Sequence, residues 1–277
     1  MLEKVRNVVK NSPDAPSEAR TARDLFKATI PFSVESTKKS WWLVASTFLL
    51  LIASLVGAAV APIWPLRLMF SLLSALLMVR AFITYHDYMH NAILSRSRIA
   101  WWLFRVYAAF SLTPPRSWKH SHNYHHGHVG KIAAASIGAF PLMTTDMWRD
   151  ASLATRIGYR IERHPLTVLT GYITIFLFSV TLLPFLRNPA RHWDSLLVLL
   201  GHGALIAALW IFGGFDVAFF VVLLPMTIAS MVGSYLFFAQ HSFEDMHVLS
   251  ADSWTYQRAA MESSSYMKLS KLMAWFT

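Results

Sequence analysis

The sequence contains no cysteine among its 277 residues, and charged side chains are scarce in it. The lack of cysteine excludes disulfide-stapled folds, thiolate metal sites, iron–sulfur clusters and cysteine nucleophiles. Only 14% of the residues are charged, against about 25% in an average soluble protein. We also find no glycine-rich nucleotide-binding loop. The pair Gly213-Gly214 is typical of a turn. These shortages exclude a disordered chain and are unusual for a soluble globular domain.

Long apolar runs account for the missing charge. They cover residues 41–61, 68–85, 166–186, 195–212 and 217–239, and Arg80 is their only charged residue. About 20 apolar residues in a helix cross a hydrocarbon core about 30 Å thick. The sequence therefore predicts an all-α integral membrane fold.

The basic residues orient these runs, because lysine and arginine concentrate on the cytoplasmic side of membrane spans. The connection at 187–194 carries two arginines, whereas the connection at 213–216 carries no basic residue. We therefore expect two transmembrane helical hairpins, at 41–85 and 195–239. The run at 166–186 is then expected to form a re-entrant or interfacial helix.

The more polar parts of the chain suggest a division into two domains. Residues 1–40 hold no apolar run, so we expect a cytoplasmic N-terminal segment without a signal peptide. Residues 41–277 form the expected membrane domain. Within it, residues 86–165 combine ten basic side chains with tryptophans, tyrosines and apolar patches. This mixture predicts amphipathic helices at the membrane interface.

The net charge of +10 could also indicate a nucleic-acid-binding protein. The basic residues lie beside the apolar runs, however, where membrane topology already accounts for them. We therefore expect no nucleic-acid partner, and we expect a multi-pass protein of the bacterial inner membrane.

A first pair of histidines lies at 86–90, in the sequence HDYMH, where the second apolar run ends. Residues four apart share one face of a helix, so His86 and His90 could bind one metal ion from a single turn. Asp87 could then orient one of these ligands through a hydrogen bond. Taken alone, the pair is equally consistent with two ordinary interfacial histidines.

A denser cluster occupies residues 120–128, where five of nine residues are histidine. The H-x-x-H-H spacing at 122, 125 and 126 lets one of these rings point to one metal ion while the others point to a neighbouring ion. Imidazole binds iron, zinc, copper and nickel, so the ligand type does not select the metal. A histidine-rich tract that binds metal without catalysis is the alternative interpretation.

These two clusters resemble the first and second histidine boxes of the membrane fatty acid desaturases, an integral-membrane di-iron family. The matching segments are HDYMH at 86–90 and WKHSHNYHH at 118–126, and the W-K-x-x-H-x-x-H-H form is specific. Spacing and topology agree from about residue 41 to the end, and the FFAQHSFED stretch looks like the family's additional histidine after the last span. The resemblance implies O2-dependent introduction of a double bond into an acyl chain at a non-haem di-iron centre.

The resemblance also implies a set of site residues and partners. The implied metal ligands are His86, His90, His122, His125, His126 and His241. Asp87, His120 and His128 are candidates for contacting these ligands, and no other residue is assigned a catalytic role. The implied cofactors are two iron ions, with O2 as co-substrate. The implied partners are an acyl lipid, acyl-CoA or acyl-carrier substrate, membrane lipids, and a ferredoxin or cytochrome b5 type electron donor. The histidine site is expected to face the cytoplasm.

One part of the family pattern lies outside this sequence. A third histidine box, another H-x-x-H-H, should follow a segment like 263–277. We therefore expect the chain to be C-terminally incomplete, as a fragment or a natural truncation, and inactive by itself. The sequence encoded after Thr277 would test this expectation.

Two alternative functions stay open at this point. A lipid hydroxylase or ketolase of the same di-iron class is one, because sequence alone does not separate insertion of oxygen from removal of a second hydrogen. A non-catalytic membrane protein that binds or transports metal is the other. Transport favours ionisable residues inside the spans, yet the apolar runs hold only Arg80 and His202. His202, inside a run, is expected to need a hydrogen-bond partner.

Overall fold

The structure is a computed structural model that describes residues 22–132 and 139–277. The chain divides into two units, Met1–Glu35 and Ser36–Thr277. The described part of the first unit contains α2 (Ala22–Thr29) and η1 (Ile30–Phe32). Much of the predicted 1–40 segment lies outside the described residues, and its division from the membrane domain stays a prediction.

Four helices of the second unit are long and apolar enough to cross a membrane. They are α3 (Thr37–Val60), α4 (Trp64–Met89), α11 (Trp193–Gly213) and the continuous helix Phe215–Ala239. The last is made of α12 (Phe215–Ala218), the π-helical η3 (Phe219–Leu223) and α13 (Leu224–Ala239). The described residues contain no β-strand, only an isolated bridge between Lys131 and Leu249. The prediction of an all-α membrane fold is therefore confirmed.

The run at 166–186 forms a shorter, irregular helix. It contains α9 (Pro165–Leu169), the π-helical η2 (Tyr172–Leu182) and α10 (Leu183–Arg187). The apolar part, Tyr172–Arg187, is shorter than the four long helices. This length agrees with the expectation that the run does not cross the membrane by itself.

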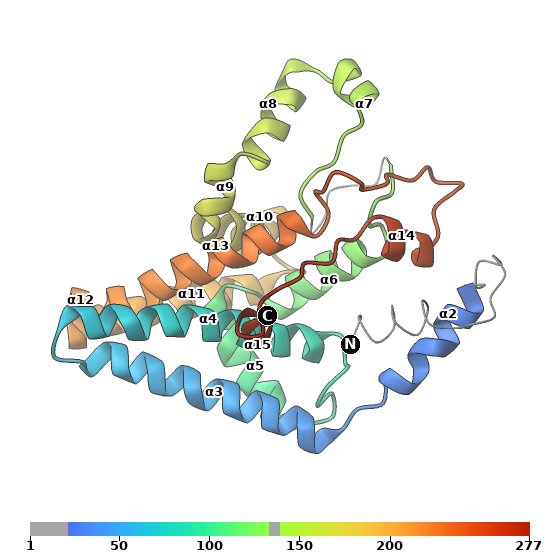
Figure 1. Cartoon of the computed structure of the whole chain (residues 1–277). Coiled ribbons are helices and arrows are strands. Elements are labelled where there is room, and N and C mark those ends of the chain that lie inside the picture. Colours follow the sequence, from blue (N-terminus) through green and yellow to red (C-terminus); the bar gives the residue numbers. More distant parts are fainter. Residues whose placement is uncertain (1–21, 133–138) are drawn as a thin grey trace. The chain divides into compact units, whose positions relative to one another are not determined.

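The first two spans lie side by side and antiparallel (Figure 1). Small residues allow the close approach: Ser54 and Ser74 share a hydrogen bond of 2.8 Å between their hydroxyl oxygens. A Cβ atom on Gly57 would lie only 2.8 Å from the ring of Phe70. Such small-residue contacts are typical of helix packing in membranes. Pro65 lies in the first turn of α4, where its missing N–H costs nothing.

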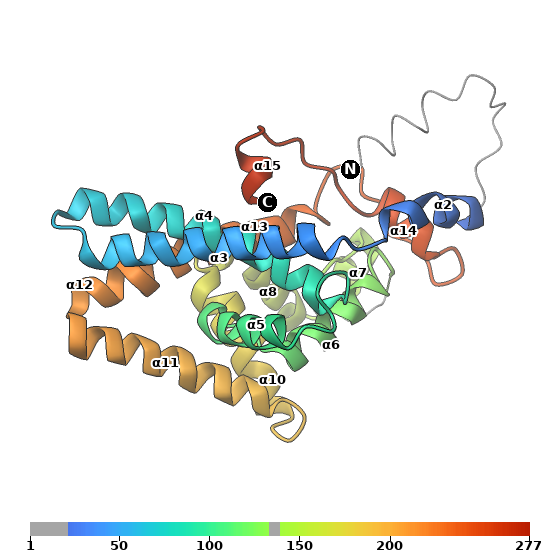
Figure 2. The ribbon, with the colours of Figure 1, turned by 90° about the horizontal axis from the view of Figure 1, so that it is seen from below.

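The last two spans are arranged differently from a closely packed hairpin. From Gly214 onward the chain turns away from α11, as Figure 2 shows, and α13 packs along α4. The irregular helix η2 contacts both α11 and α13. The approach to α13 is close, because a Cβ atom on Gly171 would lie 2.1 Å from the Ser234 hydroxyl oxygen. The helix η2 therefore separates α11 from α13, although these two helices are neighbours in the sequence.

Two polar side chains inside the spans have partners. The Tyr172 hydroxyl lies 2.6 Å from Nε2 of His202, which is the hydrogen-bond partner expected for this histidine. Arg80 donates to the Thr47 hydroxyl at 3.0 Å and to the backbone carbonyl of Trp275, and its guanidinium lies 3.9 Å from the Trp275 ring centre. The one charged residue of the apolar runs thus ties the C-terminal segment to α3 and α4.

Short helices connect and follow the spans. They are α5 (Arg98–Ser111), α6 (Pro115–His126), α7 (Thr145–Asp150), α8 (Leu153–Glu162), α14 (Tyr256–Glu262) and α15 (Met273–Phe276). On α8 the exposed Leu153, Ile157 and Ile161 repeat every four residues and form one apolar stripe. This amphipathic pattern agrees with the prediction for the region 86–165.

Candidate metal centre

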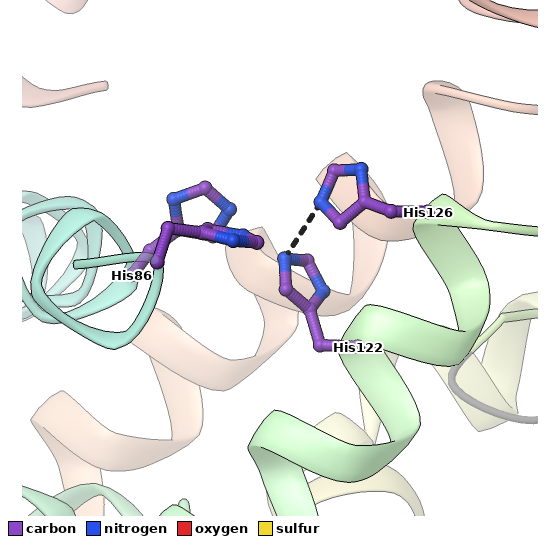
Figure 3. Close-up of side chains that lie close together, drawn as sticks. His86, His122 and His126 are labelled. Carbon is purple, nitrogen blue, oxygen red and sulfur yellow. Dashed lines mark hydrogen bonds between the residues drawn. The ribbon is translucent and has the colours of Figure 1, made fainter. Parts of the chain in front are cut away.

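Four imidazole rings meet where the end of α4 faces α6. His86 lies in the last turn of α4, and His90 follows the end of that helix. His122 and His126 lie four residues apart on α6 and therefore on one face of it. Their rings point toward His86 across the gap between the two helices (Figure 3). The ring centres lie 4.8 Å apart for His86 and His122 and 5.0 Å apart for His90 and His126.

The ring of Trp118 packs against this group of imidazoles. It is 5% exposed, and its ring stacks on His122 with centres 4.2 Å apart and planes at 23°. It also meets the edges of His86 and Phe82. Because Trp118 and His122 are four apart on α6, their contact is local, whereas the contacts with His86 and Phe82 fix α6 against α4.

The two remaining predicted ligands form a separate pair beside the first group. Nε2 of His125 lies 3.0 Å from Nε2 of His241, which follows the end of α13. Nδ1 of His241 lies 2.8 Å from the carbonyl oxygen of Ser263. A carbonyl only accepts, so Nδ1 carries the proton and Nε2 of His241 keeps its lone pair directed at His125.

A similar contact orients His86. Its Nδ1 lies 3.1 Å from the Asp87 carboxylate, so that Nδ1 donates and Nε2 is left to face the other rings. Hydrogen bonds of this kind, from the far ring nitrogen to a carboxylate or carbonyl, commonly accompany metal-binding histidines. Asp87 was among the residues expected to contact a ligand, whereas Ser263 was missed, because a backbone carbonyl carries no sequence signal.

Burial keeps the central rings neutral. Burial first, and the neighbouring imidazoles second, lower the pKa of His122 to about 2, of His125 to about 3 and of His126 to about 4. The pKa values of His90 and His241 are also lowered, chiefly by burial. A neutral imidazole has a free lone pair, which is the form that binds metal.

The donor set fits a transition metal. The ligand atoms of His86, His90, His122 and His126 all lie within 4.8 Å of one another. Imidazole nitrogens bind zinc, for example, at about 2.1 Å, so the ligand atoms of one tetrahedral ion are about 3.4 Å apart. The most distant pair of these four ligand atoms would therefore need to close by at most about 1.4 Å. An all-imidazole set suits iron, zinc, copper or nickel better than magnesium or calcium.

A cavity of about 450 Å³ adjoins these histidines. Five of the six candidate ligands line it, all except His90. Its other walls are mainly apolar and include Met78, Phe176, Met226 and Phe237. Along α13 the lining extends from Met226 to Gln240, a length of about 21 Å at about 1.5 Å per helical residue. The cavity therefore runs from the histidines deep between the spanning helices.

Comparison with known proteins identifies the family. The sequence model of the fatty acid desaturase family matches residues 62–277. This chain belongs to the fatty acid desaturase family. A curated fatty acid desaturase of Bacillus subtilis (strain 168) is 29% identical over 266 residues, which cover 94% of this chain and 74% of the relative. Family membership implies a membrane oxidoreductase that acts on lipid acyl chains.

The other histidines of this desaturase family member lie apart from the cluster. His120 contacts Arg191 at 3.2 Å and faces the ring of His192, and His128 stacks on Tyr124. His247, 63% exposed at its side chain, pairs with Glu262 at 3.0 Å. None of the contacts described for these three reaches a candidate ligand side chain. The expected roles of His120 and His128 beside the ligands therefore gain no support from their contacts.

Proposed function

We propose that this desaturase family member introduces a double bond into a lipid acyl chain at a non-haem di-iron centre. His86, His90, His122 and His126 would hold one iron ion, because their ligand atoms converge within 4.8 Å. His125 and His241 would contribute to the second, because their Nε2 atoms face each other at 3.0 Å. When bound, iron supplies the activation of O2 and the cleavage of an unactivated C–H bond, which no side-chain acid or base achieves.

The observation that carries this proposal is the continuity of the cavity. Its lining passes from His86, His122 and His125 to Met78, Phe176 and Met226 without an intervening charged residue other than Asp87. The apolar walls would hold an extended acyl chain and exclude water. Asp87 and the Ser263 carbonyl would keep the rings of His86 and His241 in fixed orientations. A metal-storage site would need no apolar channel beside its ligands.

We further propose a separate electron donor of the ferredoxin or cytochrome b5 type. The reaction consumes two electrons besides those taken from the substrate, since O2 is reduced to two molecules of water. The chain has no cysteine, so it offers neither an iron–sulfur cluster nor a thiol pair to supply them. The substrate would be an acyl lipid, acyl-CoA or acyl-carrier thioester. The site would face the cytoplasm of a bacterial inner membrane.

The test replaces ligands from both groups in the full-length protein. His86→Ala and His125→Ala should each abolish formation of new unsaturated fatty acids, by about 100-fold or more. The protein is expressed in a host that supplies a reductase and donor, and its lipids are profiled by gas chromatography with mass spectrometry. His247→Ala is the matched control and should retain activity within about twofold, because surface changes rarely matter. Full activity in either ligand variant would defeat the assignment.

A further inference from the structure

The helix that carries the second histidine cluster begins without a capping side chain of its own. Pro114 precedes α6 and Pro115 opens it, and neither has a backbone N–H to donate. The first turn contains no acidic residue. The first N–H group of α6 that needs an acceptor therefore belongs to Arg116.

A carboxylate from a distant helix supplies that acceptor. The backbone N–H of Arg116 donates to Oδ2 of Asp194 over 2.7 Å. Asp194 lies in the first turn of α11 and is only 4% exposed. Its other oxygen, Oδ1, is buried without a hydrogen-bond partner among the described residues. Burying a carboxylate is costly, and here the N-terminal end of the α6 dipole partly offsets that cost.

The same end of α11 contacts α6 at two further points. The Arg116 guanidinium lies 5.0 Å from the ring centre of Trp193, and Arg191 reaches Nδ1 of His120 at 3.2 Å. Arg116 and His120 are four apart and share one face of α6. Trp118, His122 and His126 share another, which faces α4. The start of α11 therefore contacts a face of α6 other than the one that carries His122 and His126.

We propose that Asp194 is a positioning residue for the metal centre, an inference that rests on the proposed function. Asp194 touches no candidate ligand and acts through α6. By fixing the first N–H group, it sets where this 12-residue helix begins and how it is rotated. One residue of slippage rotates a helix by about 100°. Such a rotation would turn His122 and His126 away from His86.

Metal retention is the first readout. In the purified full-length protein, Asp194→Ala should speed the loss of iron to a chelator by about 10- to 100-fold, the usual effect of losing a residue that supports ligands. Asp194→Asn keeps an acceptor oxygen and should restore most of the retention. Ser195→Ala is the matched control, because this neighbouring hydroxyl is fully buried and has no hydrogen-bond partner among the described residues. It should behave as wild type within about twofold.

The second readout locates α6 without using metal or activity. Spin labels on Asn123→Cys and Ser95→Cys, both exposed positions in this cysteine-free chain, report the distance between α6 and the segment after α4. Asp194→Ala should shift or broaden this distance in the metal-free protein, and Asp194→Asn should largely restore it. If Asp194→Ala does not accumulate, Asp194→Leu, which also removes the acceptor oxygen and is similar in size, replaces it with the same expected shift.

The outcomes separate this inference from the proposed function. An unchanged label distance together with unchanged iron loss in Asp194→Ala would overturn the inference. A lower melting temperature with both readouts unchanged would also overturn it, because Asp194 would then only stabilise the fold. If the wild type binds no iron but the label distance still shifts, the metal assignment fails while the control of α6 by Asp194 stands.

Discussion

At the scale of single residues, Gly130 governs how the C-terminal segment reaches His241. Its φ angle is +65°, and a Cβ atom there would lie 2.2 Å from the Ser263 hydroxyl oxygen. Ser263 is fully buried; its hydroxyl donates to the carbonyl of His247, and its own carbonyl accepts from Nδ1 of His241. Only glycine combines this backbone conformation with so close an approach.

We therefore expect Gly130→Ala to disturb both the fold and the metal centre. Backbone strain alone costs about 1–3 kcal/mol, and the displaced Ser263 would no longer orient His241. Thermal unfolding in detergent and chelator-driven metal loss measure the two effects. Gly158→Ala is the control, because a Cβ atom on Gly158, in α8, would meet no neighbouring group within 4 Å, and it should be neutral or slightly stabilising. Equal behaviour of the two variants would show that the Gly130 contact is unimportant.

The sequence singled out six candidate histidines more readily than it showed how they group. Helical spacing alone places His122 and His126 on one face, and the motif resemblance adds His241. That His125 pairs with His241, rather than with the first box, depends on how α6 and α13 pack. The structural contacts of Ser263 and Asp194 are equally invisible in the sequence, because one is a backbone acceptor and the other lies 78 positions from its partner.

At the scale of helices, the apolar runs predicted the spans well. The four long helices begin and end within four residues of the predicted runs. The packing partners were not predictable from hydropathy, because every span is apolar on all sides. The choice of α4 as the neighbour of α13, with η2 inserted beside α11, depends on small residues such as Gly171 and Ser234.

The arrangement of these helices predicts a shared side for the histidine clusters. Cysteines placed at Asn91 and Glu244, both exposed and close to the ends of α4 and α13, should react from the same side of sealed vesicles with a membrane-impermeant thiol reagent. A cysteine at Ile63, in the turn between α3 and α4, should react from the other side, because α4 crosses between them. Labelling of Asn91→Cys and Glu244→Cys from opposite sides would contradict the arrangement.

At the scale of the whole membrane unit, α4, α5, α13 and η2 line an apolar cavity that ends at imidazoles from three separate segments. Residues from α4, α6 and the end of α13 contribute to that end. Ligands so far apart in sequence form a site only when the helices pack correctly. The metal centre and the acyl cavity would therefore be gained or lost together with the fold.

Iron content per chain tests this central claim most directly. Elemental analysis of the purified full-length protein should find iron in the wild type and in His247→Ala, whose histidine lies outside the cluster. His122→Ala should lose most of it, because His122 belongs to the four-imidazole group and is partly buried. Circular dichroism should show that this variant keeps its helices. Iron retained in full by His122→Ala, or lost equally from His247→Ala, would contradict the account.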